Sequence, residues 1–272
     1  MLISVEEALE RVLGQVAPLP AEEKPLLESL GQVLAEDVFA ERDVPPLDNS
    51  AMDGYAVRAL DTARASETNP VYLQVTAEVA AGYTTATKVT EGTAVRIMTG
   101  APLPAGADAV VQFEDTGQAR RAKGQSQPRL EQTVTIVRAA SLGLNVRQAG
   151  EDIRAGQVVV HRGTVLRPAE LGVIASLGRE TVSVHRRSVV AVLSTGDELV
   201  PLGQSLSPGQ IYNSNGTSIA AAVARTGGVP RVLGIGRDNA EDIVPKLRQA
   251  AECDLLITTG GVSRDCVIDV GD

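Results

Sequence analysis

Aromatic side chains are scarce in this chain of 272 residues, which has four Tyr, two Phe and no Trp. Proteins that bind single-stranded nucleic acids stack the bases on aromatic rings, and this chain has almost no rings to offer. Its formal charge of −9 at pH 7 also argues against the basic stripe that binds phosphate backbones. The composition therefore argues against a nucleic-acid partner. It does not exclude one small anionic ligand, which can bind at a locally positive site or through a cation.

Cysteine is equally rare, and the hydrophobic runs are short. Cys253 and Cys266 form no C-x-x-C pair and no disulfide framework, which is typical of a protein in a reducing cytosol. The first ten residues contain three Glu and no basic residue, unlike a signal peptide. The aliphatic run at residues 189–193, like every other apolar run in the sequence, is far too short to cross a bilayer. We therefore expect a cytoplasmic protein without a membrane segment.

The length and the first forty residues indicate a folded protein of more than one unit. Single hydrophobic cores stop growing at roughly 250 residues, so 272 residues predict two or more units. Ser4 and Glu7 form a capping box, and apolar residues then recur at helical spacing, which predicts a helix that ends around Gly14. A second helix is expected over residues 23–30, and an extended segment over residues 32–38.

Residues 45–156 predict an all-β module. Gly, Pro and polar loops separate short runs of strand-forming residues there. These runs cover residues 71–79, 93–98, 109–113 and 134–137. Residues 116–128 contain Arg, Lys and several Gln, and we interpret them as a long exposed hairpin loop.

Strands and helices alternate from residue 158 onwards. The expected strands cover residues 158–161, 188–193, 229–235 and 255–258, and the expected helices cover residues 168–177, 217–225 and 241–251. Right-handed crossovers make the last three strands an open parallel sheet. Asp238 and Glu241 are expected to cap the last helix. Its start lies as late as Asp242 if Pro245 is to stand in the first turn.

Three loops follow the carboxyl ends of the predicted parallel strands, where open α/β sheets bind ligands. They cover residues 194–198, 234–238 and 258–263, and they combine glycine with hydroxyl and carboxylate side chains. Glycine lets backbone N–H groups approach a phosphate, and carboxylates hold a hard cation such as Mg²⁺. The pattern therefore favours an anionic phosphorylated ligand with a divalent metal. The alternative is that Asp197, Glu198 and Asp238 merely cap helices.

The β-rich module has dense segments of its own at residues 45–56, 96–108 and 150–153. Turn formers and short polar side chains dominate them, and composition alone favours tight turns over a site. His161 and His185 are single residues without the spacing of metal ligands, and we interpret both as structural.

Several motifs resemble those of the molybdopterin molybdenumtransferases, the family that includes the gephyrin E domain. They are Asp-Asn-Ser-Ala-Met-Asp-Gly-Tyr-Ala at 48–56, Arg-Ile-Met-Thr-Gly-Ala at 96–101, Gly-Glu-Asp at 150–152, Ser-Thr-Gly-Asp-Glu-Leu at 194–199, Gly-Gln-Ile-Tyr at 209–212 and Gly-Gly-Val-Ser at 260–263. The resemblance implies Mg²⁺-dependent insertion of molybdate into adenylylated molybdopterin, with release of AMP. It also implies an elongated homodimer, whose cleft lies between the α/β domain of one subunit and the β-rich domain of the other.

The resemblance also implies roles for single residues. The catalytic residues would be Asp53, Thr99, Asp152, Glu198 and Asp238. The residues that bind the pterin substrate would be Ser194, Thr195, Gly196, Gly260, Gly261 and Ser263. The metal ligands would be Asp197, Glu198, Asp238 and Asp269. The adenylyltransferase of the preceding step is a further expected partner.

The implied fold class is α/β plus β, in an elongated multidomain chain. An incomplete three-layer α/β domain with an open parallel sheet, which binds molybdopterin, would comprise residues 1–20 and 179–272. A linking domain would comprise 21–44 and 157–178, and a β-rich inserted module 45–156.

The sequence departs from the family pattern after Ser263. Asp265 stands where the family has glycine, Ile268 where it has aspartate, and Asp269 comes one residue late. The family's next helix, its lysine and its small C-terminal β-domain are missing, so we expect a truncated chain with impaired activity. The alternatives are a non-catalytic homologue that binds molybdopterin or dimerises, and, less favoured, a scaffold. The sequence leaves open whether tungstate replaces molybdate.

Overall fold

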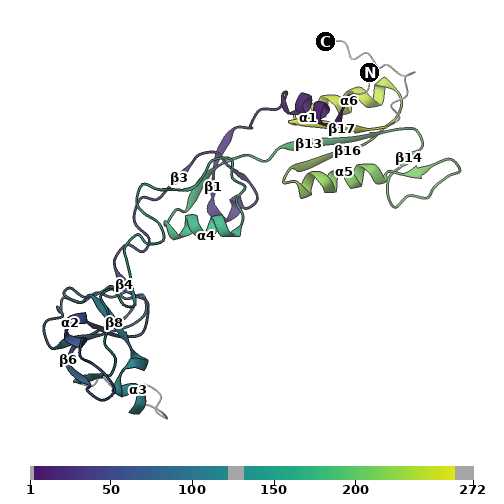
Figure 1. The fold of residues 1–272 in the computed structure, drawn as a ribbon. Coiled ribbons are helices and arrows are strands. Elements are labelled where there is room, and N and C mark those ends of the chain that lie inside the picture. Colours follow the sequence, from purple (N-terminus) through teal and green to yellow (C-terminus); the bar gives the residue numbers. More distant parts are fainter. Residues whose placement is uncertain (1–2, 122–131, 261–272) are drawn as a thin grey trace. The chain divides into compact units, whose positions relative to one another are not determined.

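The computed structural model describes residues 3–121 and 132–260. The described residues fall into two compact units (Figure 1). The first unit takes its described residues from Met1–Asp37, His161–Ala175 and Arg179–Asp272, and the second comprises mainly Val38–Val160. The chain therefore enters the second unit from the first and returns to it.

An open parallel sheet is the centre of the first unit. Its strands are β13 (Val189–Thr195), β16 (Val229–Gly236) and β17 (Leu255–Thr259), in the order β16-β13-β17 among the described residues. Residues 190–193 of the central strand are at most 5% exposed, as expected for a strand covered on both faces. The predicted alternation of strands and helices is confirmed here.

Two helices connect these strands, α5 (Ser214–Arg225) and α6 (Ala240–Ala250). The chain steps from β13 to β16 in one direction and crosses back past β13 to reach β17. Right-handed crossovers in opposite directions place their helices on opposite faces of the sheet. Figure 1 shows α5 on one face and α6 on the other, so this part of the unit has three layers.

The ends of these two helices differ from the sequence prediction. Helix α5 begins three residues earlier than expected, because the side chain of Asn213 caps it by accepting a hydrogen bond from the Gly216 N–H. Asn239, and not Asp238, caps α6 and accepts from the Asp242 N–H. Pro245 therefore stands inside α6, beyond the first turn, where a proline removes one backbone hydrogen bond.

A small antiparallel sheet precedes the open sheet in the same unit. It contains β1 (Ala21–Pro25), β12 (Thr181–His185) and β2 (Val33–Leu34), in the order β1-β12-β2, and η1 (Leu26–Ser29) follows β1. The predicted helix over residues 23–30 is therefore wrong for residues 23–25, which are in a strand, and only η1 within it is helical. Residues 21–25 pair with residues 181–185, and a partner that distant leaves no mark in the local sequence. Helix α4 (Pro168–Ser176) lies between β2 and β12 in the chain order, as predicted.

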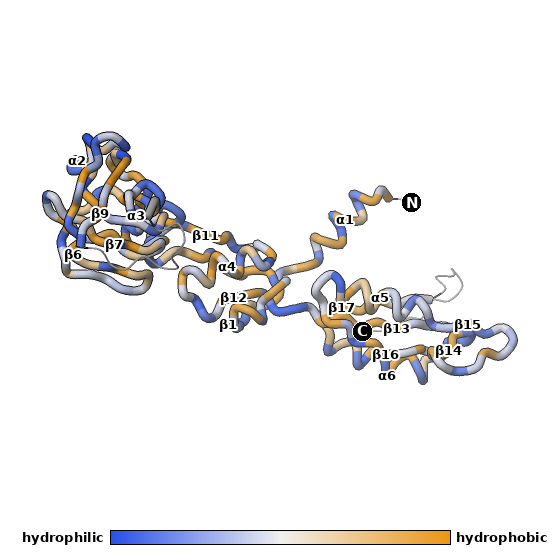
Figure 2. Tube along the Cα trace, turned by 90° about the horizontal axis from the view of Figure 1, so that it is seen from below, coloured by the Kyte–Doolittle hydropathy of each residue, from blue (hydrophilic) through white to orange (hydrophobic). Residues whose placement is uncertain are grey.

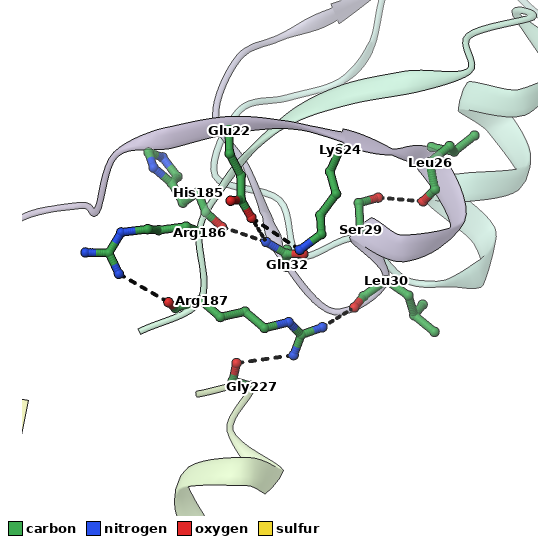
Figure 3. Close-up of polar contacts among 10 residues, drawn as sticks. All are labelled: Glu22, Lys24, Leu26, Ser29, Leu30, Gln32, His185, Arg186, Arg187 and Gly227. Atoms are coloured by element: carbon green, nitrogen blue, oxygen red, sulfur yellow. Dashed lines mark hydrogen bonds and ion pairs between the residues drawn. The ribbon is translucent and has the colours of Figure 1, made fainter. Parts of the chain in front are cut away.

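Two consecutive arginines after β12 connect the small sheet to the open sheet. The Arg187 guanidinium donates to the carbonyl oxygens of Leu30 (2.8 Å) and Gly227 (3.2 Å), as Figure 3 shows. Arg186 makes a bidentate ion pair with Asp254, whose carboxylate also accepts from the Val189 N–H (2.8 Å). These contacts tie the starts of β13 and β17 to the preceding segment.

Asp254 should make the stability of the protein depend on pH. The Arg186 guanidinium, helped by the Val189 N–H, lowers the pKa of Asp254 to about 2, below the value of about 3.9 in an unfolded chain. The ion pair therefore stabilises the fold above pH ~4 and is lost as the pH falls toward 2. We expect Asp254→Asn to lower the free energy of unfolding at pH 7, and this difference to shrink below pH 4. Urea unfolding of both proteins across that range would measure it, and a difference independent of pH would contradict it.

The N-terminal helix and two short strands complete the first unit. Helix α1 (Val5–Leu13) is capped by Ser4, as predicted, and its apolar residues Val5, Leu9 and Val12 are all more than half exposed. Figure 2 shows hydrophobic stretches along this helix. Strands β14 (Leu199–Val200) and β15 (Ile211–Tyr212) form a parallel pair beyond the end of β13. Within the described part of the chain, no helix has the length and apolar character needed to span a membrane.

The second unit is built on a mixed sheet in the order β8-β5-β7-β6-β9. Its strands are β5 (Gly54–Val57), β6 (Val71–Val79), β7 (Thr93–Ile97), β8 (Ala109–Gln112) and β9 (Thr133–Ile136). Strands β6 and β7 pair in parallel, and the other neighbours are antiparallel. Tyr55 and Val57 belong to one buried cluster and Ala56 to another, so both faces of β5 are covered.

The remaining elements of the second unit are short. They are β3 (Val38–Phe39), β4 (Asn49–Ser50), α2 (Ala59–Thr62), η2 (Phe113–Asp115), α3 (Gly117–Arg121), β10 (Val146–Arg147) and β11 (Val158–Val160). The helical turns correct the prediction of an all-β module with a loop from residue 116. Gln118 is only 3% exposed. Its side-chain N–H donates to the Thr133 carbonyl of β9, and its side-chain oxygen accepts from the Thr135 N–H. Residues 122–131 of the predicted loop lie outside the described residues.

Candidate functional site

The loops predicted from the sequence meet at one edge of the open sheet, because the parallel strands end there together. The Thr195 hydroxyl at the end of β13 lies 3.4 Å from the Thr259 carbonyl at the end of β17. The Gly196 N–H donates to the carbonyl of Gly236 at the end of β16 (3.1 Å). All three strand ends are thus joined by hydrogen bonds around β13.

Two glycines at this edge leave room that no side chain could share. A Cβ on Gly260 would collide with the Thr195 hydroxyl and lie 3.1 Å from the Thr195 carbonyl oxygen. Gly196 has a φ of +147°, and a Cβ there would collide with the Glu198 carboxylate. Glycine at 260 therefore lets the two loops approach each other closely, and glycine at 196 allows the positive φ of this turn.

A pocket of about 240 Å³ opens beside these loops. The lining residues include Thr195, Glu198, Asn213, Ser214, Asn215 and Gly260. They supply hydroxyl, amide and carboxylate groups from the end of β13, the start of α5 and the end of β17. The pocket therefore combines donors for an anion with one carboxylate.

The N-terminus of α5 supplies donors that the sequence prediction missed. Ser214 and Asn215 belong to its first turn, whose N–H groups have no acceptor within the helix. The helix dipole also makes such a terminus favourable for an anion. The sequence predicts this helix only from residue 217, which puts Asn213, Ser214 and Asn215 in the preceding loop. The sequence signal for the earlier start of α5 is Asn213, because asparagine is a preferred N-cap residue.

The predicted acidic residues at this edge have different surroundings. The Glu198 side chain lines the pocket. The Asp197 carboxylate accepts from the Asp238 N–H (3.3 Å), so these two loops are joined. Asp238 is exposed and does not line this pocket. Ser194 is fully buried beneath the start of α5, and its hydroxyl oxygen has no partner among the described residues.

A magnesium site would need several oxygen ligands from these same side chains. Within residues 3–121 and 132–260, no three His, Cys, Asp or Glu side chains form a group that could hold a metal ion. Asp269, the fourth predicted ligand, lies outside the described residues, as do Gly261, Ser263 and Asp265. The described side chains alone therefore do not fit a complete site. The metal stays a prediction, and we derive no step through it.

The second unit holds its own pair of predicted residues in direct contact. The N–H and the hydroxyl of Thr99 both donate to Asp53 Oδ1, each at 2.7 Å. These two bonds, first the backbone and then the hydroxyl, hold the pKa of Asp53 below its ordinary value, and Arg96 contributes a smaller Coulombic effect. Asp53, Arg96 and Glu114 line a pocket of about 210 Å³.

Asp152 is held by other contacts in the second unit. Its N–H donates to the Val44 carbonyl (3.1 Å), next to the cis peptide bond between Val44 and Pro45. It does not line the pocket that contains Asp53. The structure thus joins Asp53 to Thr99 by hydrogen bonds, whereas Asp152 does not line the pocket that Asp53 lines.

Replacing Thr99 with Val should raise the pKa of Asp53 part of the way to its usual value. Valine removes the hydroxyl donor but keeps the N–H donor, which has the larger effect on this carboxylate. A carboxyl-carbon NMR titration of Asp53 would measure the change, with Thr99→Ser as the control that keeps both donors. An Asp53 pKa equal in the Val and Ser variants would show that the hydroxyl does not hold the charge.

Two family models match the chain. Residues 3–178 match the model described as "MoeA N-terminal region (domain I and II)". Residues 191–266 match the model described as "Probable molybdopterin binding domain". Together they cover most of both units.

Individual relatives give the same result. The molybdopterin molybdenumtransferase of Staphylococcus epidermidis is 38% identical over 262 residues, which are 96% of this chain and 60% of the relative. Molybdopterin molybdenumtransferase 2 of Mycobacterium tuberculosis is 42% identical over 240 residues, which are 88% of this chain and 56% of the relative. The chain therefore spans somewhat more than half the length of these curated relatives.

A solved structure confirms the fold. The crystal structure of the molybdopterin biosynthesis MoeA protein from Pyrococcus horikoshii OT3 matches with a TM-score of 0.84 at 34% sequence identity. The match covers 97% of this chain and 68% of that one.

Proposed function

Because the chain belongs to the MoeA family, we propose that it acts in molybdenum cofactor biosynthesis as a molybdopterin molybdenumtransferase. Its substrates would be adenylylated molybdopterin and molybdate, and its products AMP and the molybdenum cofactor. The resemblance found in the motifs of the sequence is thereby confirmed at the level of the family. The reaction itself is a proposal, since the chain spans 60% of the first of these relatives.

The pocket at the start of α5 is the observation that carries this proposal. The reacting part of the substrate is a diphosphate, and a diphosphate needs a site rich in hydrogen-bond donors. Thr195, Ser214 and the first-turn N–H groups of α5 supply such donors around one pocket. We assign the phosphates of adenylylated molybdopterin to this site.

Glu198 is the residue in this pocket suited to accept a proton. A carboxylate cannot bind a phosphate directly, because the like charges repel, but it can accept a proton from a water molecule that attacks phosphorus. The water oxygen then forms the new P–O bond, the phosphoanhydride P–O bond breaks, and AMP leaves with that electron pair. The donors around the pocket stabilise the negative charge that develops on the phosphate oxygens.

The other expected assignments remain part of the proposal. Asp53, Thr99 and Asp152 would contact molybdate or the pterin, and Asp238 would assist Glu198. Mg²⁺, the homodimer, the contact with the preceding adenylyltransferase and the cytoplasmic location belong here as well.

The test is an insertion assay on the 272-residue chain with adenylylated molybdopterin and molybdate. We expect AMP and molybdenum cofactor to form together, and the proposal would be wrong for this chain if neither formed.

A second candidate is a non-catalytic homologue, favoured by the departures from the family pattern at Asp265 and Ile268. That candidate expects tight binding of adenylylated molybdopterin, measured by calorimetry, without any release of AMP.

A further inference from the structure

The loop that carries Glu198 is held by a residue from another strand. Arg237, just after β16, directs its guanidinium at this loop. Its Nη1 donates to the carbonyl oxygen of Asp197 at 2.7 Å and lies 3.4 Å from that of Leu199. These two carbonyls belong to the residues immediately before and after Glu198. The guanidinium thus holds the backbone on both sides of the glutamate.

Two more hydrogen bonds complete the attachment of this loop. The Glu198 carbonyl accepts from the Ile211 N–H of β15 (2.9 Å), on the other side of the loop. The Asp197 carboxylate accepts from the Asp238 N–H, the residue next to Arg237. Residues 197–199 are therefore joined to residues 237–238 by hydrogen bonds that involve both backbone and side-chain groups.

Arg237 is itself anchored to the start of α6. Its N–H donates to Asp242 Oδ2 (2.7 Å), and Lys246 one turn later holds Asp242 Oδ1 (2.5 Å). The Asp242 N–H is bound by the Asn239 cap. The capped first turn of a helix is a rigid base, so it can fix the direction from which Arg237 reaches the loop.

The loop needs such a support because little else in it is regular. It leaves β13 through Gly196 at a φ of +147°, a backbone conformation that residues with a side chain rarely adopt. Within the loop, the Leu199 N–H donates to the Gly196 carbonyl oxygen, and this hydrogen bond is long at 3.4 Å. Since Asp197 and Glu198 are exposed, packing does not hold them either.

We propose that Arg237 is the positioning residue of Glu198, acting through the Asp197 and Leu199 carbonyls and not on the substrate. The catalytic effect of Arg237 rests on the proposed function. Its effect on the structure of the loop rests on the hydrogen bonds alone. A misplacement of about 1 Å in a reacting group costs roughly 100-fold in rate. Losing Arg237 should therefore slow the chemical step and leave the substrate pocket formed.

The experiment compares Arg237→Ala with Arg248→Ala, which removes an exposed arginine from the last turn of α6. Amide hydrogen exchange comes first. In Arg237→Ala the N–H groups of Leu199 and Asp238 should exchange about tenfold faster, while those of β13 stay protected. The Arg248 variant should match the wild type. Unchanged exchange at Leu199 and Asp238 would overturn the proposal, whether or not the chain is active.

The kinetic arm uses adenylylated molybdopterin and molybdate. For Arg237→Ala we expect kcat for AMP release to fall about 10- to 100-fold, with KM for adenylylated molybdopterin changed less than about twofold. Added methylguanidinium should restore part of the kcat of Arg237→Ala. The kcat of Arg237→Lys should lie between those of Arg237→Ala and the wild type. A raised KM with normal kcat would instead make Arg237 a substrate-binding residue. If the wild type releases no AMP, the proposed function fails while the exchange result still decides the positioning role.

Discussion

Replacing Glu198 with Gln is expected to slow the release of AMP by at least about 100-fold, the usual contribution of a well-placed general base. Glutamine keeps the size and the hydrogen-bonding capacity of the side chain but cannot accept the proton of the attacking water. Glu198 lines the pocket at the start of α5, where we place the phosphates. KM for adenylylated molybdopterin should change little, because Thr195 and the α5 N-terminus remain. Steady-state assays of AMP would measure both constants.

The matched control is Glu241→Gln, an exposed glutamate in the first turn of α6 that does not line the pocket. It changes the net charge of the same unit by the same amount and should leave kcat unchanged. If the Glu198 variant retained more than about a tenth of the wild-type rate, Glu198 would not be the base. If both variants were slow, charge in general would be responsible and not this position.

Replacing Gly54 with Ala is expected to destabilise the second unit by about 3 kcal/mol or more, the upper end of the cost of overpacking. Gly54 opens β5 and pairs with Gln112 of β8. A Cβ at this position would collide with the Val111 carbonyl oxygen and lie 2.9 Å from Gln112 Cα. These are backbone atoms of a paired strand and cannot move aside. The pocket with Asp53 would be displaced as well, because Gly54 lines it.

Tyrosine fluorescence during urea unfolding would measure this loss. The chain has no Trp, and Tyr55, Tyr72 and Tyr83 all lie in the second unit, so three of the four tyrosines report on it. Gly172→Ala is the contrasting variant, since Gly172 stands inside α4 and a Cβ there meets no atom within 4 Å. Helix α4 belongs to the first unit, so the stability of this variant is followed by far-UV circular dichroism. Alanine should stabilise that helix by about 0.5–1 kcal/mol. A Gly54 variant as stable as the wild type would show that β5 and β8 are not paired as described.

The sequence predicted the elements whose signal is local. The aliphatic run of β13 predicted a strand buried on both faces, and the Ser4 capping box predicted the start of α1. The three loops at the carboxyl edge were expected from the order of strands and helices alone. Strand β1 was predicted as a helix, because its pairing with β12, some 160 residues away, is invisible to local periodicity.

The sequence by itself determined the family, the alternation of strands and helices, and the residues available for chemistry. The tertiary structure decided which of these residues meet. It joined Asp53 to Thr99 and placed Glu198 beside the start of α5. It also used Asp197 and Arg237, 40 residues apart, to hold one loop. Spacing along the chain encodes local structure, whereas hydrogen bonds between distant loops depend on distances that only the packed strands and helices fix.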